Sequence, residues 1–209
     1  QFIGGDFFDV IPIGPNKLAI AVGDVTGKGI AASVLMTASQ GFLHAALSQH
    51  GDVGRAMTAL NQFINPRRPD HKFVTAWAGV FDLEAQTLTY VDAGHSYAVM
   101  QADDGSFTQL DCGGGLPVGV MDDSQYESTT ISLAPGGRVV IVSDGIIEQM
   151  GMVQRDDGTI VRDQFELNGV KKSVLLSGDD VIAPLFAAVI NHAGTSNLSD
   201  DATAVMVKW

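Results

Sequence analysis

The sequence predicts an α+β domain in which antiparallel β-sheets carry helices on their outer sides. Two observations lead to this expectation: segments with strand character outnumber helical ones, and most strands are separated by turns of hairpin length. Connections this short join antiparallel neighbours. Helices packed outside such sheets bury the apolar face of both, which gives a layered domain.

The first part of the chain should form a hairpin followed by two helices. Strands are expected at residues 2–13 and 18–22, with a Gly-Pro-Asn turn between them. Residues 30–46 are rich in Ala, Leu and Met, which favours a helix. Asp52 is a suitable N-cap for a second helix that ends at Ile64.

Strands should dominate the rest of the chain, separated by turns rich in aspartate, proline and glycine. Residues 151–178 show no clear pattern. Asp179 and Asp180 are placed to cap a helix over residues 181–192. Strands are expected at residues 73–83, 87–92, 97–102, 107–110, 126–133, 138–142 and 202–208.

The composition bounds the class of protein. The chain has 209 residues, 45% hydrophobic and 17% charged, so it can form one domain with a sizeable core. Its net charge of -12 and the lack of a basic stripe argue against a nucleic-acid partner. The single cysteine, Cys112, excludes an intrachain disulfide and fits a reducing compartment such as the cytoplasm.

The ends and apolar runs of the sequence suggest how it is used. The start has no signal-peptide pattern, and no apolar run reaches the roughly 18 residues of a membrane span, so we expect no membrane segment. The chain begins at Gln1, inside an expected strand. We therefore expect a larger protein to continue upstream.

Two predicted strands each end in an aspartate on their apolar face. Alternation puts Asp24 on the same face as Ile20 and Val22. In the same way, Asp144 shares a face with Val142. Each aspartate is followed by a glycine-containing segment expected to be a flexible turn. Both carboxylates should therefore lie at the rim of the core.

Carboxylates in this position suggest a metal site. An ionised carboxylate at the rim of a core is costly unless it is paired or metal-bound. The chain has 24 Asp and Glu but only 12 Lys and Arg, so a divalent cation is a suitable partner. Asp6 and the pair Asp200 and Asp201 are further acidic positions near predicted strands. Oxygen ligands favour Mg²⁺ or Mn²⁺, and no His/Cys spacing indicates zinc. The alternative is that each aspartate only forms a turn.

Six short segments resemble the PPM family of metal-dependent protein phosphatases, and they follow the family's order over nearly the whole chain. The similarity is closest to its bacterial SpoIIE-like branch, which includes RsbU-type regulators. The segments are Gly-Gly-Asp-Phe-Phe-Asp at 4–9, Gly-Asp-Val-Thr-Gly-Lys-Gly at 23–29, Ala-Gly-His at 93–95, Gly-Leu-Pro-Val-Gly at 115–119, Ser-Asp-Gly-Ile-Ile-Glu at 143–148 and Asp-Asp-Ala-Thr at 200–203.

The resemblance implies a single phosphatase domain over residues 1–209, built as an α-β-β-α sandwich with a central antiparallel β-sandwich. It implies hydrolysis of phosphoserine or phosphothreonine by a water that two ions of Mn²⁺ or Mg²⁺ activate. The implied substrate is a phosphorylated STAS-type anti-anti-sigma protein. An upstream sensor or receiver domain and a possible homodimer would control the activity.

The motif match also implies a role for individual residues. Asp24 would bridge both metals, and the carbonyl of Val25 would bind one of them. Asp6 would act mainly through metal-bound water. Further ligands would be Asp144 and Asp200, with Asp201 as a second choice.

Two positions depart from many relatives. Thr26 stands where animal and plant members often have a His that serves as a proposed general acid, so another group must protonate the leaving oxygen. Lys28 stands where many SpoIIE-like members have His. Lys28 could attract phosphate, although a solvated loop lysine is the simpler interpretation. The same loop joins Asp24 directly to the helix from Ile30, so a shift of that helix would move Asp24.

Other interpretations remain open. His95 could be catalytic or could only stabilise a turn, and Gly113, Gly114 and Gly115 could cradle phosphate or form a plain loop. Gly-Gly-Asp-Phe-Phe is similar to a diguanylate cyclase signature, but Phe7 replaces its acidic residue. The main rival is a pseudophosphatase, a binding module that keeps the fold and holds a signalling partner without catalysis.

Overall fold

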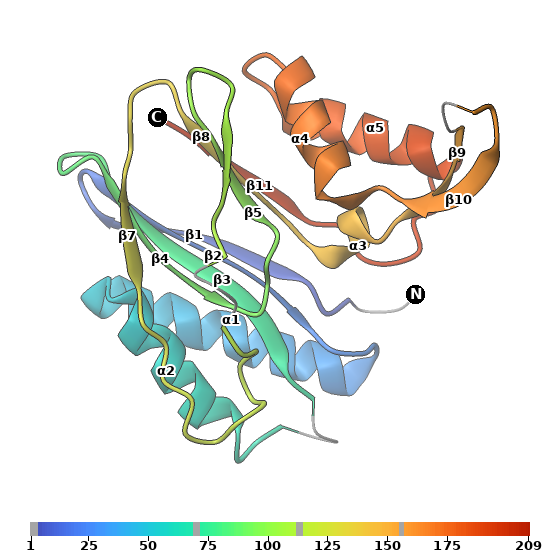
Figure 1. Cartoon of the computed structure of the whole chain (residues 1–209). Helices are drawn as coiled ribbons and strands as arrows, with labels where there is room; N and C mark the ends of the chain where they lie inside the picture. The colour runs from blue at the N-terminus through green and yellow to red at the C-terminus, as the bar shows by residue number, and fades with distance from the viewer. Residues whose placement is uncertain (1–3, 69–71, 112–114, 155–156) are drawn as a thin grey trace.

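Two antiparallel sheets stack face to face at the centre of the molecule, and helices cover the outer side of each (Figure 1). The computed structural model describes residues 4–68, 72–111, 115–154 and 157–209. The helices α1 (Ile30–His50) and α2 (Val53–Ile64) pack on one sheet, and α4 (Glu166–Leu176) and α5 (Ile182–Ala193) pack on the other. The predicted α-β-β-α sandwich is confirmed.

Each sheet is antiparallel throughout. The first has the order β1-β2-β3-β4-β7 and the second the order β11-β8-β5-β6. A separate hairpin of β9 and β10 follows the one-turn helix α3. The strands are β1 (Phe7–Gly14), β2 (Lys17–Val25), β3 (Val74–Asp82), β4 (Thr87–Ala93), β5 (Ala98–Gln101), β6 (Phe107–Gln109), β7 (Thr129–Ser132), β8 (Arg138–Val142), β9 (Met150–Gln154), β10 (Ile160–Gln164) and β11 (Ala204–Lys208); α3 is Asp144–Ile147.

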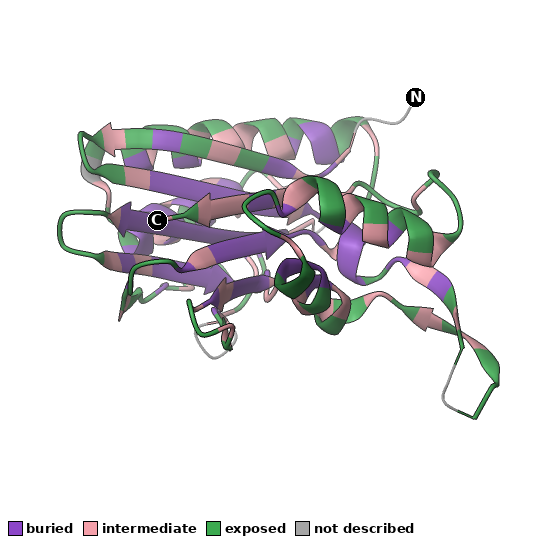
Figure 2. Ribbon diagram, turned by 90° about the horizontal axis from the view of Figure 1, so that it is seen from above, coloured by how far each residue is buried: buried purple, intermediate pink, exposed green. Residues whose placement is uncertain are grey.

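The core has three layers, one between the sheets and one under each pair of helices. Alternate residues of β2 serve different layers: Ala19 and Ala21 face α1 and α2, whereas Ile20 and Val22 face the second sheet. Figure 2 shows the central strands buried and the outer faces of the helices exposed. Because the alternation continues to Asp24, its side chain points into the space between the sheets.

Several element boundaries differ from the prediction for local reasons. β2 runs on to Val25 because Asp24 and Val25 stay paired with β3. The predicted strand at residues 126–133 shrinks to β7, since the Tyr126 N–H donates to the Thr58 hydroxyl of α2 (3.0 Å). Helix α1 is longer than predicted and ends at Gly51, which has a left-handed φ of 61°. Among the described residues, the first strand begins at Phe7; residues 2 and 3 lie outside them.

The region after Asp144 was predicted least well. The expectation of a flexible turn there was wrong, because Ile146 is buried and the Glu148 N–H donates to the Asp144 carbonyl to close α3. The segment without a clear pattern forms β9, β10 and α4. Met152 and Ile160 of the hairpin are exposed, so no core face imposes an alternating pattern on this segment.

Helix α1 is also apolar enough to raise the question of a membrane. By length and composition, its segment Ile30–Gln49, with a mean hydropathy of 1.4, could cross one. In the structure the helix packs on β1 and β2 and fully buries Leu43 and Leu47. The segment is 33% buried, so one side of the helix packs on the sheet while residues such as Ile30 and Val34 are exposed.

Candidate metal centre

Three aspartates from distant parts of the chain meet at one end of the sandwich. One carboxylate oxygen of each of Asp6, Asp24 and Asp144 lies within 4.8 Å of the others. Asp6 directly precedes β1, Asp24 lies near the end of β2, and Asp144 opens α3 after β8. The first two come from one sheet and the third from the other, so the group lies at the seam between the sheets.

Glycine at position 5 allows this close approach. The Val25 N–H donates to the Gly5 carbonyl (3.2 Å), which holds the start of the chain beside the end of β2. A Cβ at Gly5 would lie 2.5 Å from Asp24 Oδ1 and 2.7 Å from the Val25 carbonyl oxygen. Any side chain there would displace one or both of these oxygens, so they flank the Gly5 position together.

The three carboxyl groups repel one another in the protein without metal. Burial, followed by the charges of Asp6 and Asp144, raises the pKa of Asp24 to about 8. Burial is also the main cause that raises the pKa of Asp6. The pKa of Asp144 is raised by burial and then by the charge of Asp200. A positive partner in their midst would remove this penalty.

The group fits a hard divalent cation. Asp6 Oδ2 is buried and has no hydrogen-bond partner. Half-buried carboxylate oxygens that converge from three side chains are ligands of the kind that Mg²⁺ and Mn²⁺ take. The donor set therefore matches the predicted cofactor class.

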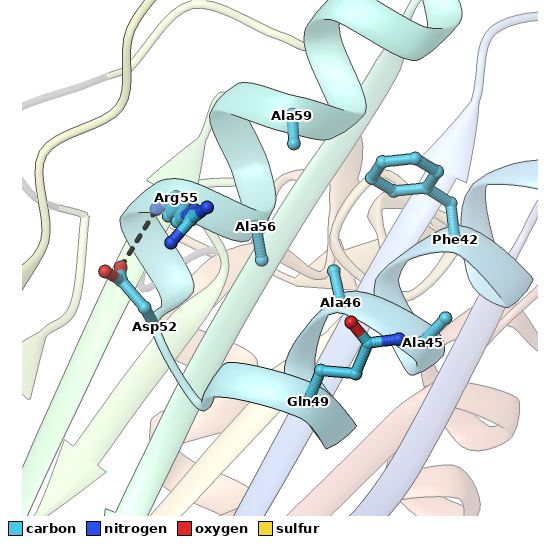
Figure 3. A pocket seen from close by; sticks show the side chains of 8 residues that line it. All are labelled: Phe42, Ala45, Ala46, Gln49, Asp52, Arg55, Ala56 and Ala59. Atoms are coloured by element: carbon cyan, nitrogen blue, oxygen red, sulfur yellow. Dashed lines mark hydrogen bonds between the residues drawn. The ribbon is translucent and has the colours of Figure 1, made fainter.

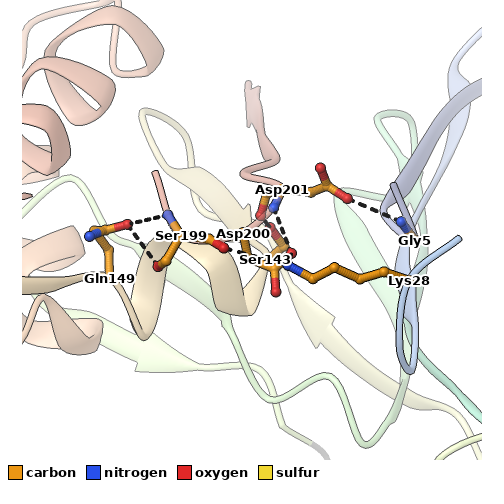
Figure 4. A network of polar contacts seen from close by, with 7 residues as sticks. All are labelled: Gly5, Lys28, Ser143, Gln149, Ser199, Asp200 and Asp201. Atoms are coloured by element: carbon orange, nitrogen blue, oxygen red, sulfur yellow. Dashed lines mark hydrogen bonds and ion pairs between the residues drawn. The ribbon is translucent and has the colours of Figure 1, made fainter. Parts of the chain in front are cut away.

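Asp200 and Asp201 lie beside this group and are not part of it. The Gly5 N–H donates to Asp201 Oδ2 (3.1 Å), and Asp200 Oδ1 lies 3.0 Å from the Lys28 ammonium (Figure 4). Both carboxylates still act on Asp144, because their charges contribute to its raised pKa. The predicted ligand set is thus divided into an inner group of three and an outer pair.

Comparison with known proteins assigns the chain to a family. The family model of SpoIIE, Stage II sporulation protein E, matches residues 14–209. The chain belongs to the SpoIIE family. Asp6 lies ahead of the matched region, so its place beside Asp24 rests on the structure. The family membership does not fit the diguanylate cyclase interpretation.

Relatives and solved structures agree with this membership. The chain is similar to the phosphoserine phosphatase RsbP of Bacillus subtilis, with 25% identity over 70% of the chain and 37% of RsbP. It superposes on the PP2C phosphatase domain structure of Bacillus subtilis SpoIIE with a TM-score of 0.79, at 21% identity, over 100% of this chain and 59% of that one. A structure of RsbX in complex with magnesium has a TM-score of 0.67 at 16% identity, over 99% of this chain and 91% of that one. The chain spans about a quarter to a half of the length of its curated relatives.

The loop that carries the outer pair in this SpoIIE-family chain is held by two residues whose roles the sequence did not reveal. Gln149 is buried, and its Oε1 accepts from the Ser199 N–H (3.0 Å) and the Ser199 hydroxyl (3.1 Å). The Ser143 hydroxyl oxygen accepts from the Thr203 N–H (2.9 Å). These bonds hold residues 199–203 next to Asp144. Ser143 opens the 143–148 motif and Gln149 directly follows it, but nothing in their spacing indicates a partner near residue 200.

The other sequence candidates have structural roles in this fold. The Thr26 hydroxyl donates to the Phe73 carbonyl (3.2 Å) and accepts from the Phe73 N–H (3.0 Å), which clamps the loop. The backbone N–H of His95 donates to Asp92 Oδ1 (2.7 Å), so His95 belongs to a buried turn. Burial lowers the pKa of His95 to about 4 and keeps it neutral. Of the glycine run, Gly113 and Gly114 lie outside the described residues, as does Cys112.

One groove on the side of α1 and α2 lies away from the aspartates. It has a volume of about 310 Å³ and lies between α1 and α2, lined by Phe42, Ala46, Gln49 and Arg55 among others (Figure 3). At the rim of the groove, the backbone N–H of Arg55 donates to the side chain of Asp52. Asp52 is thus the N-cap of α2, as predicted. None of the candidate ligands lines this groove, so it is not the place of the chemistry.

Proposed function

We propose that this chain is a metal-dependent protein serine/threonine phosphatase of the SpoIIE type. The observation that carries the proposal is the meeting of Asp6, Asp24 and Asp144 at the seam of a sandwich that belongs to the SpoIIE family. Bound Mn²⁺ or Mg²⁺ would supply positive charge for the phosphoryl oxygens and a water of lowered pKa.

Each residue then has a defined task. Asp24, which lies beside Asp6 and Asp144 in charge interaction with both, would serve two cations at once. Asp6 and Asp144 would complete the inner position, and Asp200 would extend the site outward from Asp144, with Asp201 held against Gly5. The Val25 carbonyl, beside Asp24 Oδ1, is a further candidate ligand. Thr26 is committed to the Phe73 backbone, so its hydroxyl serves the fold and not proton transfer.

The substrate we propose is a phosphoserine or phosphothreonine on a STAS-type regulatory protein. The relatives RsbP and RsbU are named phosphoserine phosphatases, which supports phosphoserine over small metabolites. The net charge of -12 disfavours acidic surfaces away from the metals, so docking must supply selectivity. The curated relatives are longer than this chain, which supports a sensor or receiver domain elsewhere in the same protein. The protein would act in the cytoplasm.

The test is turnover of a phosphoserine peptide and of a phosphorylated STAS domain, with and without Mn²⁺. We expect activity with Mn²⁺ or Mg²⁺, none after chelation, and little action on phosphotyrosine. Asp24→Asn should abolish turnover, and Asp144→Asn and Asp200→Asn should lose most of it. Asp104→Asn is the matched control, since Asp104 only accepts hydrogen bonds from Ser106 in an exposed turn.

The same experiment separates the rival function. A pseudophosphatase would bind the phosphorylated partner and release no phosphate under any metal condition. Full activity in the presence of EDTA after exhaustive dialysis would exclude a metal-dependent mechanism.

A further inference from the structure

A lysine occupies the outer side of the candidate metal centre. The Lys28 ammonium lies 3.0 Å from Asp200 Oδ1 and 3.5 Å from the Ser199 carbonyl oxygen (Figure 4). Lys28 sits on the short loop between β2 and α1, and Asp200 on the loop before β11. The contact therefore joins the loop after Asp24 to the loop of the outer aspartates.

Lys28 is distinguished from other basic residues by its salt bridge to a candidate metal ligand. Among the described residues, no other lysine or arginine forms a salt bridge with any of the five candidate aspartates. Lys72, the other lysine near this loop, donates to the Thr26 carbonyl (2.8 Å). The Lys28 ammonium therefore contacts Asp200, one of the two aspartates of the outer pair.

Asp200 Oδ1 already accepts from the Lys28 ammonium and from the Asp201 N–H (2.9 Å). A divalent ion that Asp200 shares with Asp144 would therefore compete with the ammonium for this oxygen or bind the other oxygen of the same carboxylate. In either case the positive charge of Lys28 would stay close to the incoming ion and repel it. Both effects weaken the binding of an outer ion, and neither acts on the inner group of Asp6, Asp24 and Asp144 to the same degree.

We propose that the Lys28 ammonium is an internal competitor for the second divalent cation, and that it sets the metal affinity of the outer position formed by Asp144 and Asp200. The inference rests on the proposed metal-dependent function and concerns a positioning residue outside the proposed set of ligands. Lys28 keeps Asp200 in place in the metal-free protein. It also keeps the outer position weak, so the second ion binds only at a higher metal concentration than the first.

The test measures Mn²⁺ binding to the chain in the absence of substrate. Binding is measured by isothermal titration calorimetry and by the electron paramagnetic resonance signal of free Mn²⁺. Lys28→Gln should tighten the weaker Mn²⁺ site roughly three- to tenfold, since an exposed ion pair and its like-charge repulsion are each modest. The tighter site should change less than about twofold, because it is held by the inner group.

Two variants control for charge and for the loss of any surface lysine. Lys28→Arg keeps the charge and should keep the weaker site as weak as in the wild type. Lys17→Gln removes a lysine of similar exposure that pairs with Asp82 (2.8 Å) far from the aspartates, and it should leave both sites unchanged. If Lys28→Arg tightens the site as much as Lys28→Gln, the positive charge is not the cause and the inference is wrong.

The outcomes distinguish this inference from the proposed function. A wild-type chain that binds no Mn²⁺ would overturn both. A wild-type chain that binds Mn²⁺, with an unchanged or weaker outer site in Lys28→Gln, would overturn the competition alone. A second Mn²⁺ that appears only in Lys28→Gln would support it most directly.

Discussion

Asp24 shows how one residue can be costly to the fold and still be retained. Its carboxyl lies next to two others at the seam of the sheets, and its pKa is raised to about 8 by burial and by their charges. A raised pKa means that the folded chain holds a proton which the unfolded chain has already lost. The stability that protonated Asp24 contributes is fully present below the ordinary pKa of an aspartate. It is lost as the pH rises through the pKa of about 8 that Asp24 has in the folded chain.

The first prediction follows from this loss of stability with rising pH. In the metal-free protein, Asp24→Asn should melt higher than the wild type at about pH 8, and the difference should shrink toward about pH 4. An asparagine carries no proton to lose, so this part of the pH dependence disappears. Thermal denaturation in EDTA across this range would measure it. A difference in melting temperature that stays constant with pH would contradict the assigned electrostatics.

The second prediction concerns the close approach at Gly5. Gly5→Ala should weaken Mn²⁺ binding and turnover, because the new methyl group must push away Asp24 Oδ1 or the Val25 carbonyl. Crowding of this kind costs about 1–3 kcal/mol of stability. Gly14→Ala is the control at the far end of β1, since its Cβ would make only ordinary contacts with Lys17. Equal metal affinity in both variants would show that Gly5 does not shape the site.

At the scale of elements, the sequence was informative where strands lie within the core. The ends of β2 and β8 were correctly placed at the rim of the core, because both strands are buried on one face between the sheets and on the other face under helices. The sequence was uninformative for the β9–β10 hairpin, which extends past the core with Met152 and Ile160 exposed. The short helix α3 was missed because its stability comes from the burial of Ile146, a tertiary effect.

The site was predictable in its residue types and less so in its contacts. The motifs indicated which aspartates to consider, and the family and the fold that they implied are confirmed. The separation of Asp200 from the inner group and its pairing with Lys28 could not be read from the sequence. These loops are about 170 residues apart in the chain, as the Lys28–Ser199 contact shows, and only the stacking of the two sheets brings them together.

The third prediction concerns the connection from β2 to α1. Gly29 precedes α1 with a φ of 93°, a left-handed conformation that disfavours side chains, and no atom lies within 4 Å of a Cβ there. Gly29→Ala should therefore strain the connection without a steric clash, at a cost of about 1–3 kcal/mol. Since Asp24 lies five residues upstream, we expect lower Mn²⁺ affinity and turnover with the fold retained.

A glycine within the same helix provides the control. Gly41 lies inside α1, and a Cβ there would also meet nothing within 4 Å. Gly41→Ala should stabilise the helix by about 0.5–1 kcal/mol and leave metal binding unchanged. If Gly29→Ala behaves like Gly41→Ala, the conformation of the connection does not control the position of Asp24.

At the scale of the whole molecule, the candidate ligands are divided between the two sheets. Asp6 and Asp24 belong to the five-stranded sheet, and Asp144 and Asp200 lie on segments that flank strands of the four-stranded sheet. Without metal, like charges face each other across this end of the sandwich. With metal, the same groups would be held together. The ions should therefore stabilise the stacking of the sheets as well as the chemistry.

The last prediction tests this coupling. At free Mn²⁺ of about 100 times its dissociation constant, binding to the folded state alone adds about 2.7 kcal/mol to the free energy of unfolding. For a chain of this size, that corresponds to a rise in melting temperature of roughly 5–10 °C, since each kcal/mol shifts it by about 2–4 °C. EDTA should reverse the rise, Asp144→Asn should lose most of it, and Asp104→Asn should keep it.

Amide hydrogen exchange would show which parts of the molecule gain stability when Mn²⁺ binds. Amides of β2, β3 and β8 that exchange only through global unfolding should slow by the same factor of about 100. Protection confined to residues 199–203 would mean that the ions order a loop and do not join the sheets.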